Sequence, residues 1–542
     1  MLDRIASLTW HHPRKVLAAV FLFAAVAGFV GHDVEHHLKA AGFTDPASES
    51  EKAGVVLADA LGYAAEPGLV VVVKANDGGA LKLKDPAIVA EVARLADELR
   101  GATYVGMVTN PLDNPAAYGS LIEKDRRSLV LTAHLSTTDL EDAGGDADES
   151  VRERVTSDLL DLSYGGYAPT FNEVNDQTRK DLVNAELIAF PILGLLLLIV
   201  FRGVIAASIP LLIGGLSIVG TLFALRIMSS MVDTSLFALN LATGLSLGLA
   251  VDYALLLVSR YREEVDAQGA GFEAHRRTIR TAGRTALFSG LTVAAAMSAM
   301  MLMPQRFLYS IGLAGAVVGV LSAVMALLVV PSLLAVLGPR INMWSIRRGP
   351  AVSATSSRWL SLAQGVMRRP VLVAVSTSVV LLALAAPLLD TTFTGPSAQA
   401  VPPGQQSYAT NKYLTDHYGR EVSEGVSLTV KGSVTDEQLA AIAQDIGRVP
   451  HVAAVAPFVR ASGDVAFTTA ALDDFALSGT SQDAVHDVRD LATPAGTELL
   501  VTGNTARFVD EKASLVKNAP LVIGLIVLLT CVLLFLLTGS VL

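Results

Sequence analysis

The chain has 542 residues, of which 52% are hydrophobic and 17% charged, and its net charge is −10. With a mean hydropathy of +0.50, it is too apolar for an ordinary soluble protein, and its acidic balance argues against a nucleic-acid partner. The single cysteine, Cys531, excludes an intrachain disulfide, and no Gly-Lys dipeptide occurs that could belong to a P-loop. We therefore expect a membrane protein that is not an enzyme, with no cofactor and an energy source other than ATP.

The N-terminus is basic and leads into an apolar run at 16–31, which is the order of regions found in a signal peptide. No small-residue cleavage pattern follows this run, so we expect residues 1–31 to keep it as a first transmembrane helix. The next residues include several metal-ligand types, namely His32, Asp33, Glu35, His36 and His37. Because neither a thiol nor a second motif accompanies them, a solvated stretch at the membrane surface is favoured over a metal site.

Residues 32–183 are acidic and soluble in character, and strand patterns alternate with helix patterns along them. Strands are expected at 69–74, 104–109 and 128–135, and helices at 86–100 and 149–163. Because such alternation favours a sheet covered by helices, this region is predicted to form one α/β domain.

Residues 184–338 contain five apolar segments that are long enough to cross a bilayer. They lie at 187–201, 204–225, 234–262, 286–303 and 307–337. Arginines gather around the connection between the third and fourth segments, and again in the basic loop 339–369. The two clusters are Arg260, Arg262, Arg276, Arg277, Arg280 and Arg284, and Arg340, Arg347, Arg348, Arg358, Arg368 and Arg369. The positive-inside rule places both clusters in the cytoplasm, so the N-terminus lies inside and the α/β domain outside.

The second half of the chain repeats the first in outline. A seventh apolar segment at 370–389 precedes a second soluble region at 390–518, and an eighth lies within 519–542. The second soluble region is expected to contain a strand at 426–431, a helix at 436–449 with Thr435 as its N-cap, and a strand at 453–457. The stretch at 502–520 before the eighth segment also resembles 172–191 before the second. We therefore predict an internal repeat, as in many secondary transporters.

One carboxylate, Asp252, interrupts the apolar segment at 234–262, where it costs about 2.5 kcal/mol or more and therefore indicates a functional site. Gly244, Gly248 and Asp252 share one helix face, because they are spaced by four residues. The glycines are predicted to let a neighbouring helix pack closely, which would desolvate the carboxylate, favour its neutral form and allow proton exchange near neutral pH. Tyr253 lies about 100° round the helix and can reach a flanking helix with its hydroxyl. The alternative is a structural acid that holds two helices together by a hydrogen bond.

Three stretches resemble the MmpL-type lipid exporters of the resistance–nodulation–division superfamily. They are GFTDPASES at 42–50, GLSLGLAVDYALLLVSRYREE at 244–264 and AGRTALFSGLTVA at 282–294. In that family the fourth helix carries Gly-x-x-x-Asp followed by Tyr, which here are Gly248, Asp252 and Tyr253. Ser289 matches a serine near the relay pair, although a serine in a membrane helix often bonds to its own turn. Gly283 and Gly290 are interpreted as packing glycines.

The resemblance also implies an architecture. It predicts a polytopic α-helical membrane protein with two extracytoplasmic α/β domains of the ferredoxin-like, porter type, built as an internal repeat. The family has twelve helices, whereas the second repeat here stops after the eighth. We therefore expect that these residues lack helices nine to twelve and the second acidic site, through a shortened reading frame or fragment, or because another chain completes the protein.

Together these observations predict a multi-pass plasma-membrane transporter. It would use the proton-motive force to export lipids or other hydrophobic or amphipathic molecules, with Asp252, Tyr253 and Ser289 as the proton relay and Gly244 and Gly248 as packing positions. Its expected partners are the lipid substrate, membrane lipids and protons, with a homo-oligomer or accessory proteins possible. The alternative is a non-transporting membrane sensing or assembly protein, or a protein-export accessory of the same superfamily.

Overall fold

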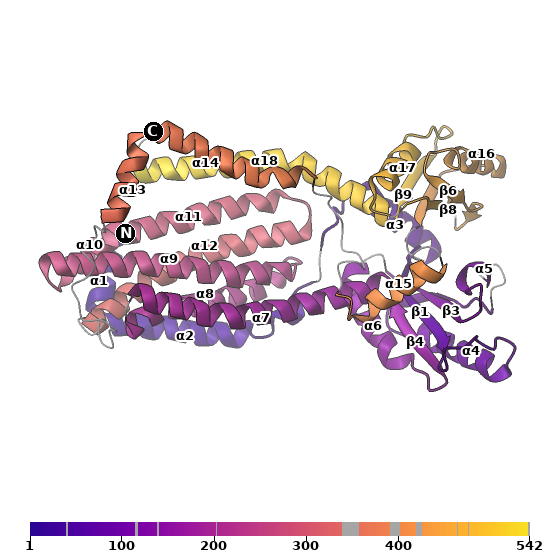
Figure 1. The fold of residues 1–542 in the computed structure, drawn as a ribbon, viewed down its shortest axis with the longest axis horizontal. Helices are drawn as coiled ribbons and strands as arrows, with labels where there is room; N and C mark the ends of the chain where they lie inside the picture. Colours follow the sequence, from indigo (N-terminus) through magenta and orange to yellow (C-terminus); the bar gives the residue numbers. More distant parts are fainter. Residues whose placement is uncertain are drawn as a thin grey trace.

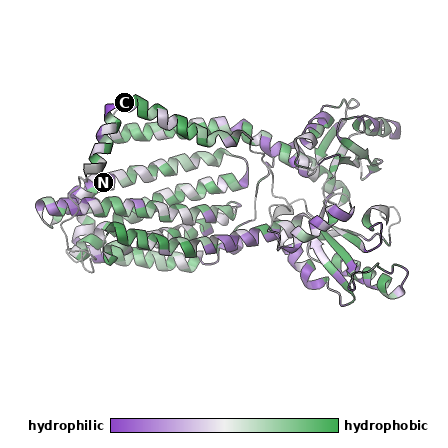
Figure 2. Cartoon of the chain, in the orientation of Figure 1, coloured by the Kyte–Doolittle hydropathy of each residue, from purple (hydrophilic) through white to green (hydrophobic). Residues whose placement is uncertain are grey.

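The computed structural model describes residues 1–39, 42–113, 118–137, 140–201, 203–338, 357–390, 402–418, 425–462, 464–474 and 476–539. The molecule is elongated, with a bundle of long helices at one end and two α/β regions together at the other (Figure 1). Hydrophobic residues dominate the long helices, while hydrophilic residues gather on the α/β regions and at helix ends (Figure 2). Within the described residues, eight helices are long and apolar enough to cross a membrane. The predicted membrane protein with α/β domains is therefore confirmed.

Each apolar segment predicted from the sequence overlaps one of these helices, although the ends of several differ by a few residues. The helices are α2 (Pro13–Gly31), α7 (Tyr167–Phe201), α8 (Val204–Ser229), α9 (Phe237–Gln268), α11 (Arg284–Ala299), α12 (Arg306–Leu337), α14 (Pro370–Ala385) and α18 (Asn504–Thr538). Helix α11 is preceded by α10 (Phe272–Thr278) and the π-helical turn η2 (Ile279–Gly283), and it is followed by η3 (Met300–Leu302). Helix α12 packs against α2, α8, α9 and α11, so it lies at the centre of the bundle.

The N-terminal helix α1 (Leu2–His11) packs beside α10 and η2, which form the arginine-rich turn that carries Arg276, Arg277 and Arg280. This contact lies at the end of the bundle away from the α/β regions (Figure 1). Arg276 donates from Nε to Asp3 Oδ1 at 3.0 Å, and Thr9 Oγ1 lies 2.9 Å from His275 Nε2. The start of the chain and the first arginine cluster therefore share one end of the bundle. Of the second cluster, Arg340, Arg347 and Arg348 and the side chain of Arg358 lie outside the described residues, which resume at α13 (Ser357–Arg368).

The histidine-rich stretch after α2 forms the short turn η1 (Val34–His37). Asp33 accepts from His37 Nε2 at 3.2 Å and from Arg226 Nε of α8 at 3.3 Å. Among the described residues, no group of three or more His, Cys, Asp or Glu side chains is placed to hold a metal ion. The charged residues here instead link the ends of α2 and α8.

The first sheet is antiparallel, with strand order β2-β3-β1-β4. Its elements are β1 (Pro67–Ala75), α4 (Pro86–Arg100), β2 (Val105–Thr109), α5 (Tyr118–Leu121), β3 (Ser128–Leu135), α6 (Leu140–Arg154) and β4 (Leu160–Gly165). The three predicted strands and helix 86–100 are confirmed. The predicted helix at 149–163 is wrong, because α6 ends at Arg154 and β4 follows. Leu160, Leu162 and Tyr164 alternate with polar residues, a period of two that fits a strand paired with β1.

The second sheet has the strand order β6-β8-β5-β9, with β7 paired to β8. Its elements are β5 (Val426–Lys431), α16 (Asp436–Ile446), β6 (Val452–Val455), β7 (Val459–Arg460), β8 (Val465–Leu472), α17 (Gly479–Arg489) and β9 (Glu498–Thr502). The predicted cap of α16 is confirmed. Thr435 Oγ1 accepts from Gln438 N at 3.3 Å, and Gln438 Oε1 accepts from Thr435 N at 2.8 Å, which is a capping box.

Two helices are exchanged between the halves of the chain. Helix α3 (Glu49–Leu61) precedes the first sheet in sequence, yet it packs on β9 and α18 of the second half. Helix α15 (Gln406–Tyr418) follows α14 and η5 (Ala386–Asp390), yet it packs on β4 and α7 of the first half. Each sheet is therefore covered in part by a helix from the other half.

Candidate functional site

Asp252 lies on the exposed side of α9 and opens into a hollow of about 430 Å³ between α9 and α11. The hollow is lined from α9 by Asp252, Tyr253, Leu255, Leu256 and Ser259, and from α11 by Thr285, Ala286 and Ser289. The structure therefore brings together the three residues that the sequence analysis assigned to a relay. Two further hydroxyls, of Ser259 and Thr285, join them, and these were not predicted.

Tyr253 is buried, with 3% of its surface exposed. Its hydroxyl donates to Ser289 Oγ across the α9–α11 interface, with 3.5 Å between the oxygens. One residue of helix turns Tyr253 away from the exposed face of Asp252 and toward the neighbouring helix. The predicted contact of Tyr253 with a flanking helix is confirmed. The proton relay itself stays a prediction.

Among the described residues no helix packs closely against Gly244 or Gly248, so the close packing expected at these two positions stays a prediction. A Cβ added at either position would meet nothing within 4 Å. The physical reason is the direction of packing: the buried face of α9, which includes Ala242, Ala250 and Leu257, is turned away from the face that carries Asp252. The glycine face is consequently exposed along with the carboxylate.

Close helix packing occurs instead between α11 and α12. A Cβ at Gly290 would lie 2.6 Å from both the Cβ of Ala323 and the carbonyl oxygen of Gly319, and one at Gly319 would lie 2.8 Å from the oxygen of Gly290. A Cβ at Gly283 would approach Leu327 Cδ2 to 3.0 Å. Gly283 and Gly290 are thus confirmed as packing glycines.

The partner glycines on α12 were missed by the sequence reasoning. Gly312, Gly315 and Gly319 are spaced by three and four residues, and each faces α11 at under 3 Å for an added Cβ. This spacing of small residues is the signal that could have identified the interface. Its effect on the site is to hold α11, and with it Ser289, close against the bundle.

The pentapeptide at 244–248 matches the G-x-S-x-G pattern of a hydrolase nucleophile elbow. In that motif the serine stands on a sharp turn from strand to helix. Ser246 instead lies inside the continuous helix α9 and is fully buried. The match therefore supports no hydrolase site.

A second candidate region is a cavity of about 650 Å³ between the two α/β regions. It is lined by the start of β1, the α5–β3 segment and the end of α15 on one side, and by β5, β6 and β8 on the other. Apolar residues line much of it, and its polar lining residues are Glu66, Ser120, Glu123, Lys124, His417, Tyr418, Ser427 and Thr469. Such a mixture suits the polar end of an amphipathic molecule.

Glu123 organises one wall of this cavity. Its carboxylate accepts hydrogen bonds from Ser128 Oγ at 2.9 Å and Tyr413 Oη at 3.0 Å, and it lies 2.7 Å from His417 Nδ1. Burial alone would raise the pKa of Glu123, but these three hydrogen bonds outweigh it and lower the pKa. Burial raises the pKa of Tyr418, which hydrogen-bonds Ser128 at 2.8 Å.

None of these wall residues was singled out from the sequence. His417 and Glu123 are 294 positions apart, so their pairing depends on the exchange of α15 between the halves. No short motif could have predicted it.

Comparison with known proteins finds one matching family model and several relatives of this chain. The model of the MMPL family matches residues 43–373. A membrane protein of Streptomyces coelicolor is 32% identical over 477 residues, which are 85% of this chain and 64% of that protein. The trehalose monomycolate exporter MmpL3 of Mycolicibacterium smegmatis is 27% identical over 585 residues, 97% of this chain and 57% of that protein.

A further relative is the mycolic acid-containing lipids exporter MmpL11 of Mycolicibacterium smegmatis. It is 27% identical over 376 residues, which are 66% of this chain and 39% of that protein. The chain therefore spans less than two thirds of the length of each of these three relatives.

Proposed function

Because the chain belongs to the MMPL family, we propose that it exports lipids or other hydrophobic or amphipathic molecules from the plasma membrane, driven by the proton-motive force. The observation that carries this proposal is the meeting of Asp252, Tyr253 and Ser289 around one hollow between two apolar helices. The names of the relatives, which are lipid exporters, favour export over the sensing or assembly alternative.

In this proposal Asp252 takes up and releases the proton, because it is the only carboxylate on the apolar stretch of α9 between Phe237 and Ser259. Tyr253 donates to Ser289, so its own oxygen is left to accept a hydrogen bond from a protonated neighbour or a water. The membrane potential supplies about 2.3 kcal/mol per charge for each 100 mV. A pH gradient adds to this, so several kcal/mol per proton is available for export.

We also propose that both α/β regions are extracytoplasmic and that the N-terminus is cytoplasmic. Three observations support this orientation: the arginine-rich turn, the contact of α1 with that turn, and the position of both α/β regions at the other end of the bundle (Figure 1). The positive-inside rule then assigns the two ends.

The ferredoxin-like, porter-type fold and the internal repeat are part of the same proposal. Both regions follow the order strand, helix, strand, strand, helix, strand, apart from the short α5 and β7. The strand orders β2-β3-β1-β4 and β6-β8-β5-β9 correspond position by position. Each region continues into a helix of 35 residues, α7 or α18. The substrate path would include the cavity between the two regions.

The experiment compares Asp252→Asn with Asp252→Glu in the whole protein in its native membrane. Asp252→Asn keeps the size and hydrogen bonding but removes proton exchange, so it should reach normal abundance and fail to export. Asp252→Glu keeps the carboxyl group and should retain part of the activity. Asp233→Asn is a matched control, because Asp233 lies outside the apolar stretch and pairs with Lys39 at 2.9 Å.

Export is measured with radiolabelled lipid at several external pH values, alongside protein abundance. Export by Asp252→Asn with the pH dependence of the wild type would refute the relay. If Asp252 has only a structural role, Asp252→Asn should export normally, because the amide can make the same hydrogen bond as the carboxyl group.

A further inference from the structure

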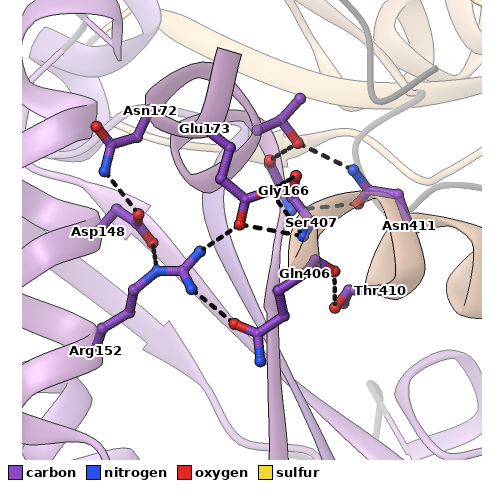
Figure 3. A network of polar contacts seen from close by, with 10 residues as sticks. Asp148, Arg152, Gly166, Asn172, Glu173, Gln406, Ser407, Thr410 and Asn411 are labelled. Atoms are coloured by element: carbon purple, nitrogen blue, oxygen red, sulfur yellow. Dashed lines mark hydrogen bonds and ion pairs between the residues drawn. The ribbon is translucent and has the colours of Figure 1, made fainter. Parts of the chain in front are cut away.

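The exchanged helix α15 is fastened at its first turn to the long helix α7. Glu173 of α7 accepts hydrogen bonds from the backbone N–H of Ser407 at 3.0 Å and from Arg152 Nη2 at 3.1 Å. Arg152 also donates from Nη1 to Gln406 Oε1 at 2.7 Å and from Nε to Asp148 Oδ1 at 2.8 Å. Figure 3 shows these side chains converging from α6, α7 and α15. We call Glu173, Arg152 and Ser407 the first clasp.

The exchanged helix α3 is fastened to α18 in the same way. Asp510 of α18 accepts from the backbone N–H of Ser50 at 2.8 Å and from Arg489 Nη1 and Nη2 at 2.7 and 3.0 Å. Arg489 also donates from Nε to Glu49 Oε1 at 3.1 Å. We call Asp510, Arg489 and Ser50 the second clasp.

The two clasps are equivalent residue by residue. Each carboxylate lies six residues after the first residue of its long helix, Glu173 after Tyr167 and Asp510 after Asn504. Each arginine lies in the last turn of the helix before the sheet's last strand, α6 or α17. Each carboxylate caps the second residue of the exchanged helix, where backbone N–H groups lack helical partners and the helix dipole favours negative charge.

Both exchanged helices lead from a clasp to the cavity between the α/β regions. The last turn of α15 carries His417 and Tyr418, which line that cavity. Helix α3 ends at Leu61, and the chain reaches the cavity at Glu66, which accepts from Arg507 Nη1 of α18 at 2.8 Å. Each wall is therefore joined through a short helix to a helix that continues into the bundle.

We propose that Glu173 and Asp510 are equivalent positioning residues that transmit movement of α7 and α18 to the wall of the cavity. This inference rests on the proposed function, in which the cavity lies on the export path. A helix is stiff along its axis, so a displacement at the first turn of α15 reaches His417 at its other end. Because the helices are exchanged, each half of the bundle moves a wall segment that belongs to the other half in sequence.

The test measures transmission along α15 without relying on export. Glu173→Gln removes the negative charge of Glu173 from the first clasp, and amide hydrogen exchange is followed at 413–418, at the far end of α15. We expect exchange there to be about tenfold faster, the effect of losing roughly one charge-assisted hydrogen bond. Asp176→Asn is the matched control, since Asp176 is an exposed carboxylate on the same helix.

An engineered disulfide between β4 and α15 should reverse the effect of Glu173→Gln. With Cys531→Ser in place, Gly165→Cys and Thr410→Cys are combined with Glu173→Gln, because a Cβ at Gly165 would lie 3.2 Å from Thr410 Cβ, near the spacing of a disulfide. Oxidation should restore slow exchange at 413–418 and also restore export lost in Glu173→Gln.

The second clasp allows an independent repeat. Asp510→Asn should impair export and should be rescued by Gly54→Cys with Thr502→Cys, where the added Cβ at Gly54 lies 3.6 Å from Thr502 Oγ1.

Unchanged exchange at 413–418 in Glu173→Gln, or exchange and export that oxidation fails to restore, would overturn the inference. A wild-type protein that exports no lipid would count against the proposed function, while the exchange measurement still decides whether the clasp transmits.

Discussion

Replacing Gly290 by alanine tests whether close packing of α11 on α12 holds the relay residues together. The added Cβ would lie 2.6 Å from the Cβ of Ala323 and 2.6 Å from the oxygen of Gly319. Carbon atoms pack best at about 3.5–4.0 Å, so the two helices must separate by roughly 1 Å. Neither neighbour can move aside, because one is a helical backbone and the other a Cβ. We expect a loss of about 1–3 kcal/mol of stability, the usual cost of overpacking.

The same separation should weaken the relay. The oxygens of Tyr253 and Ser289 are already 3.5 Å apart, which is the outer limit of a hydrogen bond, so any displacement of α11 away from α9 breaks that bond. Gly290→Ala should therefore lower both the melting temperature of the purified protein and export per molecule. Gly215→Ala in α8 is the control, since none of the described residues lies within 4 Å of its added Cβ. A wild-type melting temperature for Gly290→Ala, or an equal loss for Gly215→Ala, would refute the packing argument.

Three further predictions concern other parts of the chain. Because the folded pKa of Glu123 lies below its ordinary value of 4.5, its contribution to stability is complete above pH 4.5 and is lost as the pH falls through the lowered pKa. Glu123→Gln should therefore lower amide protection at 413–418 at pH 7, and the variant should not show the loss of protection that the wild type shows in acid. A variant with the acid profile of the wild type would contradict this. Phe43→Ala removes ring contacts with Phe237 and Phe307 at centroid distances of 5.4 and 4.9 Å, so we expect at least about 1 kcal/mol lower stability, measured as a lower melting temperature that Phe43→Leu partly recovers. Thr435→Ala removes the N-cap of α16 and should speed exchange at 436–446 by an amount equivalent to about 1 kcal/mol, whereas equal rates in variant and wild type would show that tertiary packing alone holds this helix.

Secondary structure was predictable wherever one strong pattern covered a whole element. The apolar segments, the strand at 426–431 and the cap at Thr435 depend on local sequence, and the structure confirms all of them. The failure at 149–163 came from reading one helix across a boundary. There the 3.6-residue period of α6 changes to the two-residue period of β4 within six residues, which is shorter than the window needed to recognise either period.

The residues proposed as a relay could be selected from the sequence because a carboxylate in an apolar helix is chemically conspicuous. The direction in which Asp252 faces was not predictable, because a glycine face has no intrinsic partner. Gly244 and Gly248 carry the same small-residue signal as Gly290 and Gly319, yet within the described part of the chain only the second pair is packed against another helix. Which glycines are used depends on the arrangement of the helices around α9, α11 and α12.

The sequence by itself determined that this membrane protein has several helices long and apolar enough to cross a bilayer, that two α/β regions interrupt them, and that Asp252 is a carboxylate within an apolar helix. These properties follow from composition, periodicity and local capping, each of which acts over a few turns of chain. Only the tertiary structure decided the exchange of α3 and α15, the two equivalent clasps and the pairing of Glu123 with His417. Those contacts join residues hundreds of positions apart, and they form because each sheet must cover its apolar face with whichever helix the fold brings to it.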